Sequence, residues 1–225
     1  MVVDGGSRDQ TAEVARESGA RVIVHPWPGF AAQRQFAVDA AAHDWILMMD
    51  ADEVLCAGAI PAIREILAGD RPRAAYRLRR CSYFQGRRIR FGDWRHDEVT
   101  RLFDRNQGRY PLSETVHESW HTSSATGKVL PMALEHYSYA SYAHLLEKMC
   151  LYSELGARKL RQQGRTVHGY MPMGHAMAAF WRSYVWRLGF LDGVAGAAIA
   201  WTAAVGAFMK YAIALEMQVR DGRKT

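Results

Sequence analysis

The sequence has few cysteines, and none of them forms a metal-binding or disulfide pattern. The three cysteines among 225 residues are Cys56, Cys81 and Cys150. They form no CxxC pair, and their odd number excludes a closed disulfide framework, so a reducing, cytosolic setting is favoured. The chain runs at once into Val2 and Val3 and then a polar turn, so we expect no signal peptide.

The sequence has no low-complexity tract, and we expect no membrane-spanning helix. The chain has only 7 prolines and is 49% hydrophobic and 23% charged, a composition typical of a globular protein. Residues 194–209 carry no charge, but this alanine-rich stretch is shorter than the roughly 20 residues that a spanning helix needs. The net charge of +6 indicates an anionic partner, and nucleic acid, an anionic membrane and phosphorylated sugars all qualify.

The first fifty residues alternate between strand and helix patterns. Apolar segments at 1–3, 21–25 and 45–49 predict strands, and the segments 9–17 and 30–42 predict helices. The third strand is apolar throughout, which is typical of a strand buried on both faces. This order predicts parallel strands joined by helical crossovers, and therefore an α/β fold.

The rest of the chain divides into shorter strands and long helices. Strands are expected over 74–103, and two apolar helices over about 172–189 and 194–219. We therefore expect a catalytic α/β domain over 1–140 and a C-terminal helical region over 141–225.

Arginines are concentrated between residues 77 and 101. This stretch is either a solvated strand face or a contact surface for phosphorylated sugars or anionic lipid headgroups. No nucleic-acid-binding module accompanies it, so we expect no nucleic acid partner.

Asp50 and Asp52 follow the apolar run at 45–49 directly. Open α/β sheets bind ligands beyond the carboxyl ends of their strands. Acids at positions i and i+2 offer hard oxygen ligands to Mg²⁺ or Mn²⁺, which would bridge the oxygens of a diphosphate. The alternative is a solvated acidic loop that caps the next helix, but the position after an apolar strand favours the metal site.

A second polar turn, Asp4-Gly5-Gly6-Ser7, ends the first strand. Its glycines allow close approach of the backbone to a ligand. Ser7 and Asp9 can cap the following helix, whose N-terminus is electropositive. The alternative is a capped strand–helix turn that would not need the carboxylate of Asp4.

In order and spacing, three segments resemble the nucleotide-binding half of family-2 glycosyltransferases of the GT-A fold: Val3-Asp4-Gly5-Gly6-Ser7-x-Asp9-x-Thr11, Ala32-Gln33-Arg34-Gln35 and Asp50-Ala51-Asp52-Glu53. The resemblance implies a Rossmann-like mixed sheet with flanking helices, here with a C-terminal helical hairpin. It implies a UDP-sugar donor and a Mg²⁺ or Mn²⁺ ion with Asp52 as its main ligand. The donor would be bound by Asp4, at the base or ribose, and by Ser7, Asp9, Arg34 and Asp50.

Further segments resemble bacterial lipopolysaccharide inner-core glucosyltransferases: His25-Pro26-Trp27-x-Gly29-Phe30-x-x-Gln33-Arg34, Arg101-Leu102-Phe103, His117-Glu118, His136-Tyr137-x-Tyr139 and Arg187-Leu188-Gly189-Phe190-Leu191-Asp192-Gly193. This likeness implies transfer of a hexose, glucose, to a phosphorylated or lipid-linked envelope glycan. The reaction would take place on the cytoplasmic face of the inner membrane.

The family pattern has one strand and one helix before the Asp4 turn that this sequence does not show. We therefore expect an unpaired edge in the centre of the sheet and weak activity. An inactive, membrane-associated binding or scaffold protein derived from a glycosyltransferase is the alternative. Nucleotidyl transfer is disfavoured because the sequence has no glycine-rich basic loop after its first strand.

Inverting transfer needs a general base that takes a proton from the acceptor hydroxyl. The acidic candidates are Glu118, Glu114, Asp97 and Asp93. In the family pattern the base precedes a metal-binding histidine, which favours Glu118 as base and His136 as a third metal ligand. Asp97 is the rival base, and a core histidine bonded to backbone is the alternative for His136.

Aromatic and basic residues alternate in the C-terminal helices. Trp181 and Trp186 lie near Arg182 and Arg187 in the sequence, and Trp201 lies nearer to Lys210. This mixture favours a helical hairpin that lies in a membrane interface. The alternative is a helical pair packed on the catalytic domain or in a homodimer.

Overall fold

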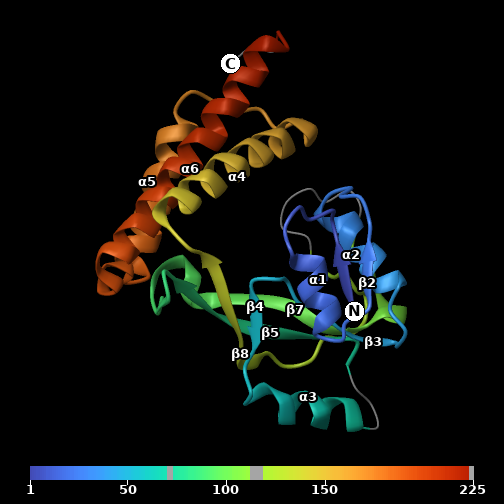
Figure 1. Cartoon of the computed structure of the whole chain (residues 1–225). Coiled ribbons are helices and arrows are strands. Elements are labelled where there is room, and N and C mark those ends of the chain that lie inside the picture. The colour runs from blue at the N-terminus through green and yellow to red at the C-terminus, as the bar shows by residue number, and fades with distance from the viewer. Residues whose placement is uncertain (70–72, 112–118, 223–225) are drawn as a thin grey trace. The chain divides into compact units, whose positions relative to one another are not determined.

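The computed structural model describes residues 1–69, 73–111 and 119–222 (Figure 1). The chain forms two compact units. The first unit consists of Met1–Met49, Ile66–Arg77 and Val99–Val129, and the second of Asp50–Glu65, Leu78–Glu98 and Leu130–Thr225.

The first unit begins with the predicted alternation of strands and helices. Its elements are β1 (Val2–Asp4), α1 (Thr11–Glu17), β2 (Val22–Val24), α2 (Phe30–Asp39) and β3 (Trp45–Leu47). Strands β1 and β2 pair in parallel, with Val3 opposite Ile23, as the crossover pattern predicts. Gly19 ends the turn after α1 at φ +81°, a conformation that glycine adopts without strain.

A six-stranded mixed sheet contains the remaining strands: β4 (Glu53–Leu55), β5 (Ala75–Phe84), β6 (Arg87–Arg88), β7 (Asp97–Asp104) and β8 (Leu130–Tyr139), together with β3. The strand order is β3-β7-β5-β8-β4, and β6 pairs with β5. Strand β8 runs parallel to β5 and antiparallel to β4. Strands β5 and β7 contribute residues to both units.

Strand β3 departs from the sequence-based expectation. In the described part of the chain it does not pair with β1 or β2, but runs antiparallel to β7, with Ile46 opposite Phe103. Its residues are half-buried, so the prediction of a strand buried on both faces is wrong. The physical reason is that β3 is the end strand in the sheet order and has one hydrogen-bonded neighbour.

Aromatic side chains fill the core of the first unit. Phe103, Tyr110 and Trp120 are buried together with Val38 and Ala75. The rings of Phe103 and Trp120 stack with centroids 4.0 Å apart. The segment 101–103 of β7 thus contributes Leu102 and Phe103 to the buried residues of this unit, which explains why these two residues are apolar.

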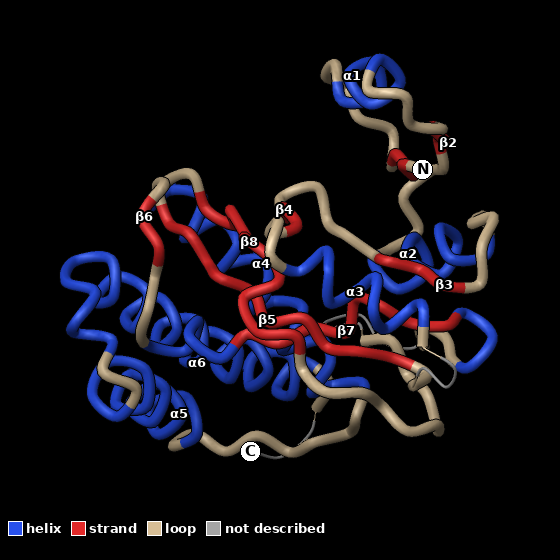
Figure 2. The backbone as a smooth tube through the Cα atoms, turned by 90° about the horizontal axis from the view of Figure 1, so that it is seen from below, coloured by secondary structure: helices blue, strands red, loops and turns tan. Residues whose placement is uncertain are grey.

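Helices make up most of the second unit. They are η1 (Gly92–His96), α4 (Tyr142–Gln162), α5 (Met171–Phe180), the π-helical turn η3 (Trp181–Trp186), η4 (Gly189–Asp192) and α6 (Gly193–Arg220); α3 (Ala59–Ala68) and η2 (Arg105–Gln107) complete the chain. Helices α4 and α5 both pack on α6 (Figure 2). The second expected C-terminal helix and the turn before it are confirmed, whereas the first is α-helical only to Phe180 and continues as the π-helical turn η3, short of the expected end near residue 189.

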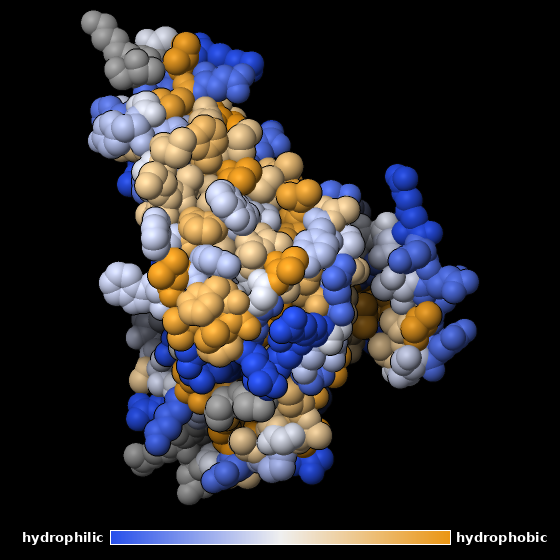
Figure 3. All heavy atoms as spheres, turned by 90° about the vertical axis from the view of Figure 1, so that its left-hand side faces the viewer, coloured by the Kyte–Doolittle hydropathy of each residue, from blue (hydrophilic) through white to orange (hydrophobic). Residues whose placement is uncertain are grey.

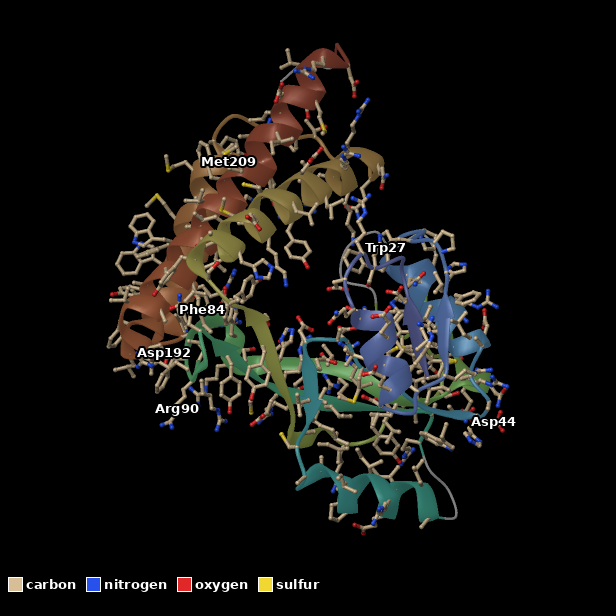
Figure 4. All side chains as sticks on the ribbon, in the orientation of Figure 1. Trp27, Asp44, Phe84, Arg90, Asp192 and Met209 are labelled. Carbon is tan, nitrogen blue, oxygen red and sulfur yellow. The ribbon has the colours of Figure 1, made fainter. Side chains whose placement is uncertain are left out.

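A buried carboxylate fixes the turn between these two helices. Asp192 accepts hydrogen bonds from the backbone N–H groups of Arg90 and Phe91, at 3.0 and 2.8 Å. Figure 4 shows Asp192 and Arg90 beside each other. A Cβ atom on Gly196 would lie 1.9 Å from the carbonyl oxygen of Gly189, so only glycine fits at the start of α6.

Candidate active site

The acidic turn after β3 belongs to the second unit and is held by its last residue. Glu53 donates its backbone N–H to the carbonyl oxygen of Asp50, and its Oε2 accepts from the N–H of Asp50, both at 3.1 Å. The turn leads into β4, whose pairing with β8 places Glu53 opposite His136. The backbone of Asp52 also accepts from the N–H of Tyr137 at 2.9 Å.

This pairing brings together two of the residues that the sequence analysis assigned to the metal. Nε2 of His136 lies 3.4 Å from Oδ2 of Asp52, with side chains 14% and 38% exposed. The hydrogen bond from His136 lowers the pKa of the Asp52 carboxyl; burial opposes this, and the charges of His136 and Lys148 add to it. His136 bonds to side chains, Asp52 and the hydroxyl of Ser138 at 2.8 Å, rather than to backbone.

The Asp52–His136 pair suits a divalent cation. It offers one hard oxygen ligand and one imidazole, a combination that Mn²⁺ accepts. Within residues 1–69, 73–111 and 119–222, no group of three or more His, Cys, Asp or Glu side chains could hold a metal ion. Asp52 and His136 would therefore supply two of the ligands, and phosphate oxygens and water could supply others, as is common for Mg²⁺-type sites.

A buried ion-pair network lies next to this turn. The Glu53 side chain is fully buried, and its Oε1 accepts from Nη1 of Arg80 at 3.1 Å. Arg80 also donates to both carboxylate oxygens of Asp97, each at 2.8 Å. Burial lowers the pKa of Arg80, but the hydrogen bond and charge of Asp97 and the charge of Glu53 outweigh it, so the pKa is raised. Both carboxylate oxygens of Asp97 are thus engaged by the guanidinium of Arg80.

Two stacked aromatic side chains, Trp94 and Tyr139, belong to the same second unit. The rings of Trp94 and Tyr139 are stacked at 5.0 Å, and Nζ of Lys148 lies 4.8 Å from the centroid of Tyr139. Burial raises the pKa of Tyr139 to about 12, and the charges of Tyr152 and Asp52 add to the shift. The hydroxyl of Tyr139 therefore stays neutral at physiological pH.

In the first unit, the turn after β1 is closed by Asp4. Its buried carboxylate accepts from the backbone N–H of Ser7, at 3.1–3.2 Å, and from the Ser7 hydroxyl. The hydroxyl bond lowers the pKa of Asp4, burial opposes it, and the backbone bonds add to it. The predicted capping by Ser7 is wrong because its hydroxyl is bonded to Asp4. Asp9 accepts from the N–H and hydroxyl of Thr11, at the start of α1.

Helix α2 packs beside the Asp4 turn. Gln33 is buried, and its Oε1 lies 2.9 Å from Nδ1 of His25. A Cβ atom on Gly5 would lie 3.3 Å from the ring of Trp27, so glycine allows the turn to lie against this indole. Arg34 follows Gln33 on α2 and is half-buried.

The predicted site residues are distributed over both units. Asp4, Ser7, Asp9 and Arg34 belong to the first unit, and Asp50, Asp52, Asp97 and His136 belong to the second. The convergence of Asp4 and Asp52 on one ion stays a prediction. Glu114 and Glu118 lie outside the described residues.

Three residues near Asp52 were missed by the sequence analysis. Glu53 was counted as part of the acidic motif but given no role, and Arg80 was taken as one of many surface arginines. The sequence carries no signal that separates Arg80 from its neighbour, since Arg79 and Arg80 are both half-buried on β5. Lys148 carries no sequence signal, because its position depends on how α4 packs against β8.

Comparison with known proteins decides the family. Residues 1–126 match the sequence model of glycosyl transferase family 2. The chain belongs to this family. Its mixed sheet with flanking helices is accordingly the GT-A α/β fold, followed by the long C-terminal helix.

Two relatives extend the similarity over most of the chain. A lipopolysaccharide core biosynthesis glycosyltransferase, LpsC, of Rhizobium meliloti is 28% identical over 233 residues, which cover 98% of this chain and 86% of the relative. An uncharacterized glycosyltransferase of Rickettsia conorii is 28% identical over 207 residues, covering 87% and 73%. The similarity thus includes the C-terminal helices and is not limited to residues 1–126.

Proposed function

We propose that this glycosyltransferase moves a hexose, glucose, from a UDP-sugar to an envelope glycan such as the lipopolysaccharide inner core, with inversion at the anomeric carbon. The observation that carries the proposal is the pair formed by Asp52, which directly precedes β4, and His136, which is on β8. Oδ2 of Asp52 and Nε2 of His136 lie 3.4 Å apart. The similarity to LpsC supports the choice of acceptor class.

The roles follow from the chemistry of the side chains. Asp52 and His136 would hold Mg²⁺ or Mn²⁺, which neutralises charge on a departing diphosphate when it is bound. Asp4, Ser7, Asp9, Arg34 and Asp50 are proposed to bind the nucleotide sugar. Glu53 keeps the Asp50–Asp52 turn in one conformation through its two hydrogen bonds to Asp50.

We assign the general base to Glu118 rather than Asp97. Both oxygens of Asp97 accept from Arg80, so this carboxylate is engaged in the ion-pair network with Glu53 and would have to give up a bond to Arg80 to accept from an acceptor hydroxyl. Glu118→Gln should lower kcat by on the order of 10²–10⁴. Asp97→Asn is the matched variant, and a larger loss of kcat in Asp97→Asn at equal folded fraction would exchange the two assignments.

Product analysis tests the whole proposal. The purified protein is incubated with Mn²⁺, lipopolysaccharide-core acceptors and a panel of UDP-sugars, and the product is analysed by mass and by the NMR coupling of its anomeric proton. One hexose added through a β-linkage from an α-linked donor is the expected result. Retained configuration, or no transfer from any UDP-sugar to any acceptor, would contradict the proposal.

We also propose that the C-terminal helices bind the cytoplasmic face of the inner membrane. Trp181, Trp186 and Trp201 are 58%, 86% and 60% exposed, although tryptophan is normally well buried. Figure 3 shows apolar residues gathered over α5 and α6. The segment Gly189–Arg220 is long and apolar enough to cross a membrane by length and composition, but α6 packs on α4 and α5, which favours an interfacial position.

Charge complements this apolar surface. Arg182 and Arg187 are on the turn between α5 and α6, where both bond to Asp93. Arg90 and Arg95 are exposed nearby in the same unit. Tryptophan beside arginine is the usual composition of a protein surface that meets anionic headgroups.

Liposome sedimentation separates membrane binding from the alternatives. We expect the protein to sediment with anionic vesicles, less so in high salt, and Trp181→Ser with Trp186→Ser to weaken binding about tenfold or more. Trp27→Ser is the control, because Trp27 is 52% exposed but belongs to the first unit. A homodimer that hides these tryptophans would instead show a doubled mass and no vesicle binding, which would contradict the proposal.

A further inference from the structure

A half-buried lysine, Lys148, acts electrostatically on the proposed metal ligand Asp52. Nζ of Lys148 donates to the carbonyl oxygen of Ser138 at 3.2 Å and lies 4.8 Å from the ring centroid of Tyr139. Among the described residues, the structure gives Lys148 no ion pair. We propose that Lys148 binds the phosphate groups of the sugar-nucleotide donor, which rests on the proposed function.

Strand β8 fixes both the lysine and the metal ligand. His136 and Ser138 are two residues apart on β8, so their side chains are on the same face of the sheet. β8 is paired with β4 along one edge and with β5 along the other, which holds its backbone in place. The Ser138 carbonyl that accepts the hydrogen bond from Lys148 and the residue His136 are therefore held by the same paired strand.

The helix that carries Lys148 begins directly after this strand. Ser141 caps α4, because its Oγ accepts from the N–H of His144 at 3.1 Å. Only a few residues separate Tyr139 from the first turn of α4. The position of Lys148 is thus set by a strand end and a capped helix, not by a long surface loop.

The aromatic stack orients the ammonium group. Tyr139 stacks on Trp94 and offers its ring to Lys148. An ammonium has three N–H donors. One is directed to the Ser138 carbonyl and one to the ring, which leaves a donor for an anion.

Lys148 interacts electrostatically with Asp52. It contributes to the lowered pKa of the Asp52 carboxyl, after the hydrogen bond and charge of His136. A second basic side chain of the same unit, Arg80, is already paired with Asp97 and Glu53. Of these two side chains, Lys148 is therefore the cation that an incoming diphosphate can pair with.

This arrangement gives Lys148 a definite chemical task. A diphosphate held by Asp52 and His136 through a cation keeps negative oxygens that the cation does not contact. A lysine ammonium fixed within the same cluster neutralises one of them, both in the bound donor and in the departing nucleoside diphosphate. The neighbouring nucleoside carries no charge and gains nothing from the lysine.

Binding measurements on matched variants test the inference. We would titrate UDP and uridine, each with Mn²⁺, into the wild-type protein, Lys148→Met and Lys148→Arg by calorimetry. The expected result is a loss of UDP affinity of about tenfold or more in Lys148→Met, because a hydrogen bond between charged groups contributes about 1.5–3 kcal/mol. Uridine affinity should not change, and Lys148→Arg should recover most of the UDP affinity.

Lys210→Met is the matched control. Nζ of Lys210 also lies over a tyrosine ring, 4.6 Å from the centroid of Tyr211, but Lys210 is on α6 and contacts Tyr211 rather than Tyr139. It should bind UDP as the wild type does. Tyr139→Leu, which removes the ring that orients Lys148, should weaken UDP binding in the same direction as Lys148→Met.

The possible outcomes distinguish an error in the assignment of Lys148 from an error in the proposed function. If the wild type binds UDP and Lys148→Met binds it equally well, the assignment of Lys148 is wrong and the proposed function stands. If Lys148→Met weakens UDP and uridine by the same factor, the lysine acts on folding and the assignment is also wrong. If the wild type binds no nucleoside diphosphate, the proposed function fails together with the inference.

Discussion

Arg80 offers the sharpest test of how the acidic turn is held. Arg80→Met removes the guanidinium that joins Glu53 to Asp97 and keeps a side chain of similar length. The Glu53 side chain is 0% exposed and that of Arg80 is 16% exposed. The substitution therefore leaves a fully buried carboxylate without its cationic partner.

The magnitude follows from this burial. Breaking a buried ion pair by removing one partner costs about 3–5 kcal/mol, because the remaining charge stays desolvated. An exposed pair costs far less. Arg158 and Glu154 pair at 2.6 Å with side chains 61% and 50% exposed, and such a pair contributes about 0.3–0.5 kcal/mol. Arg158→Met is therefore the matched control.

Urea denaturation followed by circular dichroism measures the difference. We expect Arg80→Met to lower the unfolding free energy by about 3–5 kcal/mol, a large part of the roughly 5–15 kcal/mol typical of a domain. Adding Glu53→Gln to Arg80→Met should restore part of the loss, because it removes the buried charge. The reasoning is refuted if Arg80→Met costs no more than Arg158→Met, or if the double variant is less stable than Arg80→Met alone.

Two further predictions concern the C-terminal helices. Gly196→Ala should destabilise the protein by about 1–3 kcal/mol, since its Cβ would overlap the carbonyl of Gly189, whereas Gly174→Ala, with open space around it, should not; equal thermal midpoints for the two variants would contradict this. Burial, with the charges of Lys210 and Arg165, lowers the pKa of His175, so the unfolded chain binds more protons. The stability that His175 contributes is thus present above its ordinary pKa of 6.5 and is lost as the pH falls. His175→Phe, which keeps a ring stacked on Tyr211, should reduce the decline in unfolding free energy between pH 7.5 and 5.5, and an unchanged slope would argue against it.

Local patterns predicted the elements of the fold well. The alternation of apolar segments located β1, β2 and β3, and the glycine after α1 located its end. The end of α2 was placed three residues too late because its alanine-rich sequence contains no capping signal. Periodicity is a local property, so it finds elements whose boundaries are marked by turns.

Pairing between distant strands was not predictable. Nothing near β3 in sequence indicates that it runs antiparallel to β7, because that depends on residues some fifty positions later. The contact between Asp52 and His136 was anticipated only through the family pattern, and the β4–β8 pairing produces it. The ion pairs of Arg80 and the position of Lys148 depend on sheet register and helix packing, which the sequence does not display.

Hydrolysis of the donor tests the central claim most directly. The claim is that Asp52, with His136, holds a cation against the diphosphate of a sugar nucleotide. The rate of UDP-glucose hydrolysis in Mn²⁺ is compared between the wild type and Asp52→Ala, with the folded fraction of each measured in parallel. The account predicts Mn²⁺-dependent hydrolysis by the wild type and a loss of about 10² or more in Asp52→Ala. Equal rates in the two proteins, or a wild-type rate that EDTA does not change, would contradict it.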